Sequence, residues 1–168
     1  MHSDMPQQHP SYLFLSVKGV LTNGATTWLR GEDALDITAL QLIERLCKAL
    51  GTTVIMATPW SERYPTAQAW RAAFDEYGVD IPVVGVLPTP DAGWWWGHAA
   101  QKHMAAQPDS RWVFVTDESS PTRFGRGRVI HTETNVGVTT ETLEQIAEEL
   151  AFGSPLMQEL RVLNIGKR

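Results

Sequence analysis

The sequence has few of the features that mark an exported, disulfide-bonded or membrane-spanning protein. Cys47 is the only cysteine among 168 residues, which excludes an internal disulfide and a zinc site built from several thiolates. No apolar run reaches the ~18–20 residues that a transmembrane helix needs. Residues 1–11 contain no apolar core of a signal peptide. We therefore expect a flexible leader over residues 1–11 and a cytoplasmic location.

The chain also lacks an excess of positive charge. It carries 14 Lys and Arg residues against 19 Asp and Glu residues, a net charge of -5, so it has no general attraction to nucleic acid or to anionic membranes. Hydrophobic residues make up 43% and charged residues 20% of the chain, which is typical of one soluble globular domain with a full core. Cys47 lies on the apolar side of a predicted helix, so we expect a buried, unreactive thiol.

Apolar runs alternate along the chain with segments of helical periodicity. The predicted strands are continuous apolar runs, which is typical of parallel strands buried on both faces: Tyr12–Val17, Thr53–Ala57, Val83–Val86, Trp112–Thr116 and, more weakly, Val129–Ile130. The predicted helices cover residues 36–50, 66–77, 95–106 and 139–152. This order predicts an α/β domain over residues 12–152, with a parallel sheet of about five strands between two helical layers. Residues 153–168 are expected to form a helical extension that packs on the domain or on a partner.

Four segments in this frame carry a motif-like pattern. Residues 12–22 read YLFLSVKGVLT, a buried strand that ends in a glycine turn, with Ser16 and Lys18 at the turn. Residues 53–60 read TVIMATPW, a strand followed by Thr58. Residues 111–118 read RWVFVTDE, a strand followed by the acidic pair Asp117 and Glu118. Residues 136–139 read VGVT, just before the last helix of the domain.

These four segments, in this order, resemble the motifs of the haloacid dehalogenase (HAD) superfamily, in particular its capless phosphatase-like clade. The resemblance implies a three-layer Rossmann-like fold without a large cap. In such enzymes a first aspartate attacks phosphorus, a second acts as acid and base, and carboxylates hold Mg²⁺. Ser16 stands at the first of these positions and Lys18 at the second, while Thr58 and Asp117 match the remaining hydroxyl and acid. Trp96 stands where the clade tends to have a lysine, and Lys102 is the nearest lysine.

Motif one is therefore degenerate, and we expect Mg²⁺-dependent phosphoryl transfer by the family route to be lost. A serine hydroxyl needs a base before it can attack, and Mg²⁺ needs several oxygen ligands. No catalytic residue, metal or other cofactor is expected, with Asp117 as the remnant of the metal site. Two arrangements are open for Lys18: its ammonium pairs with Asp117 in the volume of the missing metal, or it points from the loop into solvent.

Two further clusters are candidate binding residues. Trp94, Trp95 and Trp96 are consecutive, and successive helical residues point ~100° apart, so at least one indole should be exposed. The three indoles could divide into one buried, one covering the helix end and one exposed, or they could plug the vacant pocket. Arg123, Arg126 and Arg128 form a basic loop that could contact phosphates or lie in solvent.

The sequence thus favours a catalytically degenerate HAD-like protein that acts by binding. By resemblance, a capless domain works on a macromolecule or closes its site by oligomerising, so the predicted partner is another protein or a second copy. No membrane partner is expected. The alternative is a phosphatase with a modified site, in which Mg²⁺, Thr58, Lys18 and the arginine loop act on a phosphorylated macromolecule or nucleic acid. Binding of nucleic acid through the arginine loop alone is a third hypothesis.

Overall fold

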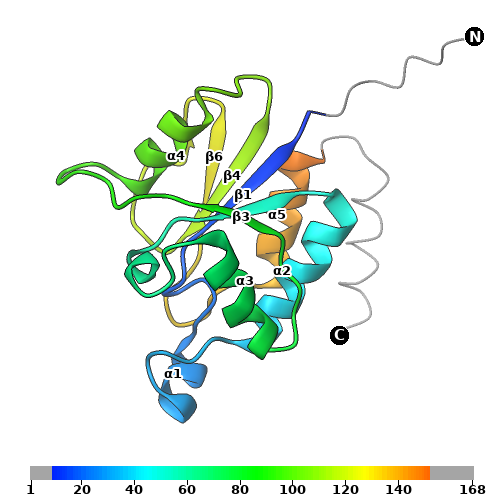
Figure 1. Cartoon of the computed structure of the whole chain (residues 1–168), viewed down its shortest axis with the longest axis vertical. Coiled ribbons are helices and arrows are strands. Elements are labelled where there is room, and N and C mark those ends of the chain that lie inside the picture. The colour runs from blue at the N-terminus through cyan, green and yellow to red at the C-terminus, as the bar shows by residue number, and fades with distance from the viewer. Residues whose placement is uncertain (1–8, 152–168) are drawn as a thin grey trace, which may run out of the picture.

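A six-stranded, mostly parallel sheet forms the centre of the molecule (Figure 1). The computed structural model describes residues 9–151, so the predicted extension over residues 153–168 and most of the leader lie outside the described residues. The strands are β1 (Ser11–Leu15), β2 (Thr53–Met56), β3 (Val83–Val86), β4 (Arg111–Thr116), β5 (Arg123–Phe124) and β6 (Gly127–His131). Their order is β3-β2-β1-β4-β6-β5. Only β5, which pairs with β6, runs antiparallel to its neighbour. The five predicted strands are confirmed, and β5 is an addition.

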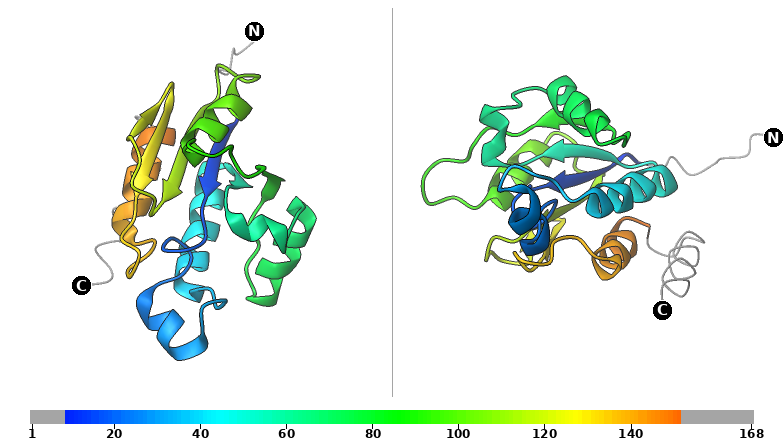
Figure 2. Two further views of the ribbon diagram at one scale, coloured as in Figure 1. Left: turned by 90° about the vertical axis from the view of Figure 1, so that its left-hand side faces the viewer. Right: turned by 90° about the horizontal axis from the view of Figure 1, so that it is seen from below.

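Alternating side chains of the central strands supply two separate core layers. Leu13 and Leu15 of β1 belong to one cluster and Phe14 to the other, and all three are fully buried, because successive strand residues point to opposite faces. The first cluster includes α2 (Ile37–Leu50), α3 (Ala67–Glu76) and α5 (Thr140–Leu150), and the second includes α4 (Trp96–Met104). Figure 2 shows α4 on one side of the sheet and α2 with α5 on the other. The predicted three-layer α/β architecture is therefore present.

The helix ends follow the capping residues of the sequence. The carboxylate of Asp36 accepts a hydrogen bond from the N–H of Thr38 at 3.1 Å and starts α2. The hydroxyl of Thr66 accepts from the N–H of Ala69 at 3.1 Å and starts α3. Such caps satisfy backbone donors that a helix leaves unpaired. The four predicted helices agree with the structure within about two residues at most ends.

A short helix, α1 (Gly24–Arg30), was not predicted. The carboxamide oxygen of Asn23 caps it by accepting from the N–H of Thr26 at 2.8 Å. None of its seven residues is buried, and Trp28 is 88% exposed. The segment therefore shows no apolar periodicity from which a helix could be predicted. Across residues 9–151, no helix combines the length and apolar character that crossing a bilayer requires.

Cys47 provides a test of the core on the α2 side. Its side chain is 3% exposed, and burial raises the pKa of its thiol to about 12. The folded protein therefore holds the thiol proton more tightly than the unfolded chain does, and the stability from this difference is lost as pH rises from about 9 toward about 12. We expect Cys47→Ala to flatten the fall in unfolding free energy over that pH range, as measured by urea denaturation. The native thiol should also resist a thiol reagent until the protein unfolds. Rapid labelling under native conditions would contradict the burial.

Candidate functional site

The carboxyl ends of β1, β2 and β4 bring three of the predicted motif residues to one edge of the sheet. Leu15 pairs with Met56 on one side and with Val115 on the other. Ser16 follows β1 directly, Thr58 follows β2 by two residues, and Asp117 follows β4 directly. The N–H of Ser16 donates to the carbonyl of Val115 at 3.1 Å. Parallel strands place such residues together, and the structure has them there.

The loop after β1 is one tight turn centred on Gly19. The carbonyl of Val17 accepts from the N–H groups of Val20 at 3.1 Å and Leu21 at 2.8 Å. Gly19 has a φ of 71°, in the left-handed region that favours glycine. Its N–H donates to the hydroxyl of Thr22 at 2.9 Å. A Cβ atom at Gly19 would lie 2.3 Å from Oδ2 of Asp117, so the backbone of this turn packs directly against the carboxylate.

The segment after β6 forms hydrogen bonds with the carbonyl groups of the same turn. The hydroxyl of Thr132 donates to the carbonyl of Gly19 at 2.6 Å. The N–H of Val138 donates to the carbonyl of Val20 at 2.9 Å, and the N–H of Gly24 donates to the carbonyl of Asn135 at 2.9 Å. The turn that carries Ser16 and Lys18 is therefore fixed by residues from the far end of the domain.

Asp117 is half-buried and accepts a hydrogen bond at Oδ2 from the hydroxyl of Thr134, at 2.9 Å. Lys18 is exposed, and within residues 9–151 it forms no ion pair with Asp117. The predicted Lys18–Asp117 pair is therefore wrong, and the solvent-facing arrangement is the one present. The physical reason is that Gly19 and Thr134 already occupy this side of the carboxylate. An exposed ion pair stabilises a protein by at most ~1 kcal/mol. The conformational entropy lost when a lysine side chain is ordered costs a similar free energy.

The residues at this edge do not fit the Mg²⁺ ion that the resemblance implies. The groups available are the hydroxyl of Ser16 and the carboxylates of Asp117 and Glu118. One oxygen of Asp117 is already hydrogen-bonded to Thr134, and Glu118 accepts a backbone hydrogen bond from the start of α4. Across residues 9–151, no group of three or more His, Cys, Asp and Glu side chains is placed to hold a metal ion. Anionic oxygen ligands are what offset the dehydration of Mg²⁺, and this edge offers too few.

Thr58 and Glu118 both have structural contacts at this edge. Thr58 is 1% exposed, and its hydroxyl accepts from the N–H of Trp60 at 3.3 Å, which starts a short 3-10 helix, Pro59–Glu62. Glu118 accepts a backbone hydrogen bond from Trp96, the first residue of α4. Burial raises the pKa of Glu118, and nearby Asp117 raises it further, while the bond from Trp96 and nearby His131 lower it. Sequence reasoning named Glu118 only as the second acid of the pair after β4; its contact with the start of α4, 22 residues earlier in the chain, follows only from the packing.

Two of the three indoles in the tryptophan run are exposed, where the sequence predicted at least one. Trp94 is 56% and Trp95 37% exposed, whereas Trp96 is half-buried against the α4 side of the core. His98 contacts two residues of the run. Its Nδ1 accepts a hydrogen bond from the N–H of Trp95 at 3.0 Å, and its ring packs edge-on against that of Trp94 with ring centroids 5.1 Å apart. The same imidazole meets Phe124 edge-on at 4.9 Å. Trp94 is therefore held in a defined position although it faces solvent.

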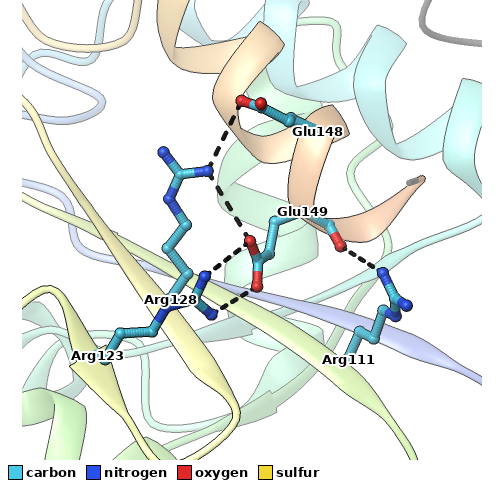
Figure 3. Close-up of polar contacts among 5 residues, drawn as sticks. All are labelled: Arg111, Arg123, Arg128, Glu148 and Glu149. Carbon is cyan, nitrogen blue, oxygen red and sulfur yellow. Dashed lines mark hydrogen bonds and ion pairs between the residues drawn. The ribbon is translucent and has the colours of Figure 1, made fainter. Parts of the chain in front are cut away.

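Two arginines of the loop, Arg123 and Arg128, contact glutamates of α5 (Figure 3). Arg123 forms a bidentate pair with Glu149 of α5, at 2.7 and 3.3 Å. Nη1 of Arg128 lies 3.8 Å from carboxylate oxygens of both Glu148 and Glu149. The guanidinium of Arg126 donates to the carbonyl of Pro108 at 2.8 Å.

The strand register locates these arginines in the sheet. Arg123 pairs with Arg128, which pairs with Val113 in the first half of β4. They therefore lie toward the edge opposite the motif residues. The structure does not bring the three arginines together with Thr58 and Lys18, so one phosphate site built from all of them is not formed.

The chain matches a known protein family. The sequence model of a family described as the HAD domain in Swiss Army Knife RNA repair proteins matches residues 12–143. That range runs from β1 to the first turn of α5 and includes all the motif segments. No curated protein matches the chain.

Proposed function

Because this chain belongs to the family of HAD domains in Swiss Army Knife RNA repair proteins, we propose that it is a catalytically degenerate member that acts by binding a macromolecule. The observation that carries the proposal is the composition of the strand edge. Ser16 stands at the end of β1, Lys18 is exposed, and the carboxylate of Asp117 is hydrogen-bonded to Thr134. Such an edge has neither a carboxylate nucleophile nor an anionic cage for a divalent ion.

Ser16 has no partner that would make it a nucleophile. A serine hydroxyl attacks only when a base removes its proton. In the described part of the chain, no histidine forms a hydrogen bond with Ser16; His131 at the same edge lies beside the hydroxyl of Ser120 instead, at 3.2 Å. This contact pattern supports binding over turnover.

The exposed indoles of Trp94 and Trp95 support a macromolecular partner. Tryptophan is enriched among the residues that dominate protein interfaces, and a partner protein or a second copy of the chain stays a prediction for this surface. The family description adds RNA as a partner class, because the proteins it names repair RNA.

The second candidate is a phosphatase with a modified site that acts on phosphorylated RNA. The family description favours it, and Thr58 and Asp117 stand where the family places a hydroxyl and an acid. It requires Ser16 or a water molecule to attack phosphorus without the usual carboxylate.

A Mg²⁺-supplemented phosphatase assay separates the two candidates. We expect the full chain to release no more phosphate from p-nitrophenyl phosphate, or from 5′- and 3′-phosphorylated RNA oligonucleotides, than its Asp117→Asn variant does. Loss of the carboxylate that matches the family's metal-binding acid should change nothing if no reaction depends on it. Turnover by the wild type that disappears in Asp117→Asn would overturn the proposal.

A gain-of-site variant provides the positive control. The double substitution Ser16→Asp/Lys18→Asp restores a carboxylate at the end of β1, on the strand next to the one that precedes Asp117, and adds a second in the turn that follows. We therefore expect it to bind Mg²⁺ in a calorimetric titration under conditions where the wild type gives no heat. Equal Mg²⁺ binding by the two proteins would show that the strand edge of the wild type already holds the ion.

A further inference from the structure

A cavity of about 520 Å³ lies between the segment that follows β3 and the outer face of α4. In Figure 1 this segment runs from β3 outward before it returns to α4. The cavity is lined by Leu87, Pro88, Thr89, Pro90, Asp91, Trp94, Ala99, Lys102 and His103. None of the motif positions is among them, although the segment after β3 lies at the same edge of the parallel sheet as Ser16 and Asp117. Its volume is in the range of pockets that hold small ligands or single residues of a polymer.

Part of the cavity lining is apolar. Pro88, Pro90 and the indole of Trp94 contribute to it. Trp94 is 56% exposed, yet the edge-on contact with His98 fixes its ring. A fixed and exposed indole is a stacking surface for a planar ring, because aromatic rings stack with any base regardless of its sequence identity.

The other part of the cavity is cationic. Ala99, Lys102 and His103 are spaced three and four residues apart, so they share one face of α4. Lys102 is exposed, and within residues 9–151 its ammonium forms no ion pair. This is in contrast to Arg123 and Arg128, whose charges are taken up by glutamates of α5. Lys102 is therefore available to an anion.

The polar groups near the aromatic end differ from those at the cationic end. Asp91 and Thr89 belong to the segment after β3 and offer a carboxylate and a hydroxyl. These groups can accept hydrogen bonds from the amino and imino groups on the edge of a base. From Trp96 to Lys102 the helix rises roughly 9 Å, so the aromatic end and the ammonium lie far enough apart to contact different parts of one ligand.

We propose that this cavity binds one nucleotide of single-stranded RNA, with its base against Trp94 and the prolines and its phosphate at Lys102. The inference rests on the proposed function only in that the domain acts by binding, and it places the binding in a cavity that the motif residues do not line. A nucleotide joins a planar ring to an anion and so matches an exposed indole beside an unpaired cation. No unmodified protein side chain combines these two groups. RNA is chosen over other polynucleotides because the family is one of RNA repair proteins.

The test measures fluorescence anisotropy of a labelled, ten-nucleotide single-stranded RNA with the full chain, in EDTA. We expect Trp94→Ala to weaken binding roughly tenfold or more, since stacking on one aromatic residue is worth that much, and Trp94→Phe to restore most of the affinity. Lys102→Ala should weaken binding and reduce the salt dependence by about one phosphate contact. Trp28→Ala is the matched control. Trp28 is 88% exposed but lies on α1 and does not line the cavity, so this variant should bind the RNA as tightly as the wild type does.

Three results would overturn the inference. They are no RNA binding by the wild type, equal losses in Trp94→Ala and Trp28→Ala, and competition by duplex RNA as strong as that by single strands. Strong competition by duplex RNA would mean that the protein recognises paired bases and does not use the cavity. Absence of RNA binding is the result expected if the surface recognises only a protein. Because EDTA removes divalent ions, Mg²⁺-dependent phosphatase activity, which would overturn the proposed function, does not affect this measurement.

Discussion

Replacing Gly19 with alanine is expected to lower the free energy of unfolding by about 2–4 kcal/mol. Two effects add at this position. The φ of 71° is strained for any residue with a side chain. In addition, the new Cβ would lie 2.3 Å from Oδ2 and 2.8 Å from Cβ of Asp117, so rotating the carboxylate alone does not clear the contact. Urea denaturation followed by circular dichroism measures the change.

Two variants separate the strain from the collision. Gly51 has a φ of 62° and no atom within 4 Å of its virtual Cβ, so Gly51→Ala should show the strain alone, about 1 kcal/mol. Adding Asp117→Ala to Gly19→Ala should recover part of the loss, because it removes the carboxylate from the contact. Equal costs for Gly19→Ala and Gly51→Ala would mean that Asp117 does not pack on this turn.

Replacing Trp70 with alanine is expected to cost about 3–5 kcal/mol, the usual range for removing a large aromatic side chain from a core. Trp70 is 1% exposed, and its ring lies 4.8 Å from that of Tyr64 and 5.6 Å from that of Phe74, between centroids. It therefore joins α3 to the core of the sheet. For a domain of this size, the loss should lower the midpoint of thermal unfolding by roughly 10 °C.

The control for Trp70 is again the exposed indole of α1. Trp28→Ala removes the same side chain from a position that is 88% exposed and should change stability by no more than about 0.5 kcal/mol. Trp70→Phe should cost less than Trp70→Ala, because the buried indole N–H of Trp70 has no hydrogen-bond acceptor to lose and the phenyl ring keeps most of the packing. Similar melting midpoints for Trp70→Ala and Trp28→Ala would contradict the assignment of Trp70 to the core.

The elements that sequence reasoning found are those whose side chains are buried. The strand containing Leu13 and Phe14 is fully covered on both faces, so an apolar run alone identifies it. The helix α2 buries one stripe and begins at the good cap Asp36. In contrast, α1 buries nothing, and β5 has two residues, so neither has a hydrophobic period to detect.

At the candidate site, the sequence predicts what strand order determines but not what depends on contacts between distant loops. The meeting of Ser16, Thr58 and Asp117 follows from parallel strand order, which the sequence pattern implies. The orientation of Lys18 does not, because it depends on the left-handed turn at Gly19 and on Thr134, which comes from another loop. The arginines could not be placed either, since their partner Glu149 lies 26 residues beyond Arg123 and only the packing of α5 reveals the pair.

The bonds that hold the turn after β1 also fix when the site can form during synthesis. The carbonyl of Gly19 is bonded to a residue 113 positions later, Thr132, and that of Val20 to Val138. A ribosome delivers the first strand early, but it must add more than a hundred residues before these partners exist. Contacts between such distant residues also close slowly. The first motif to leave the ribosome therefore cannot complete its hydrogen bonds until residues 132–138 have been made, and a nascent chain that ends before them has no completed strand edge.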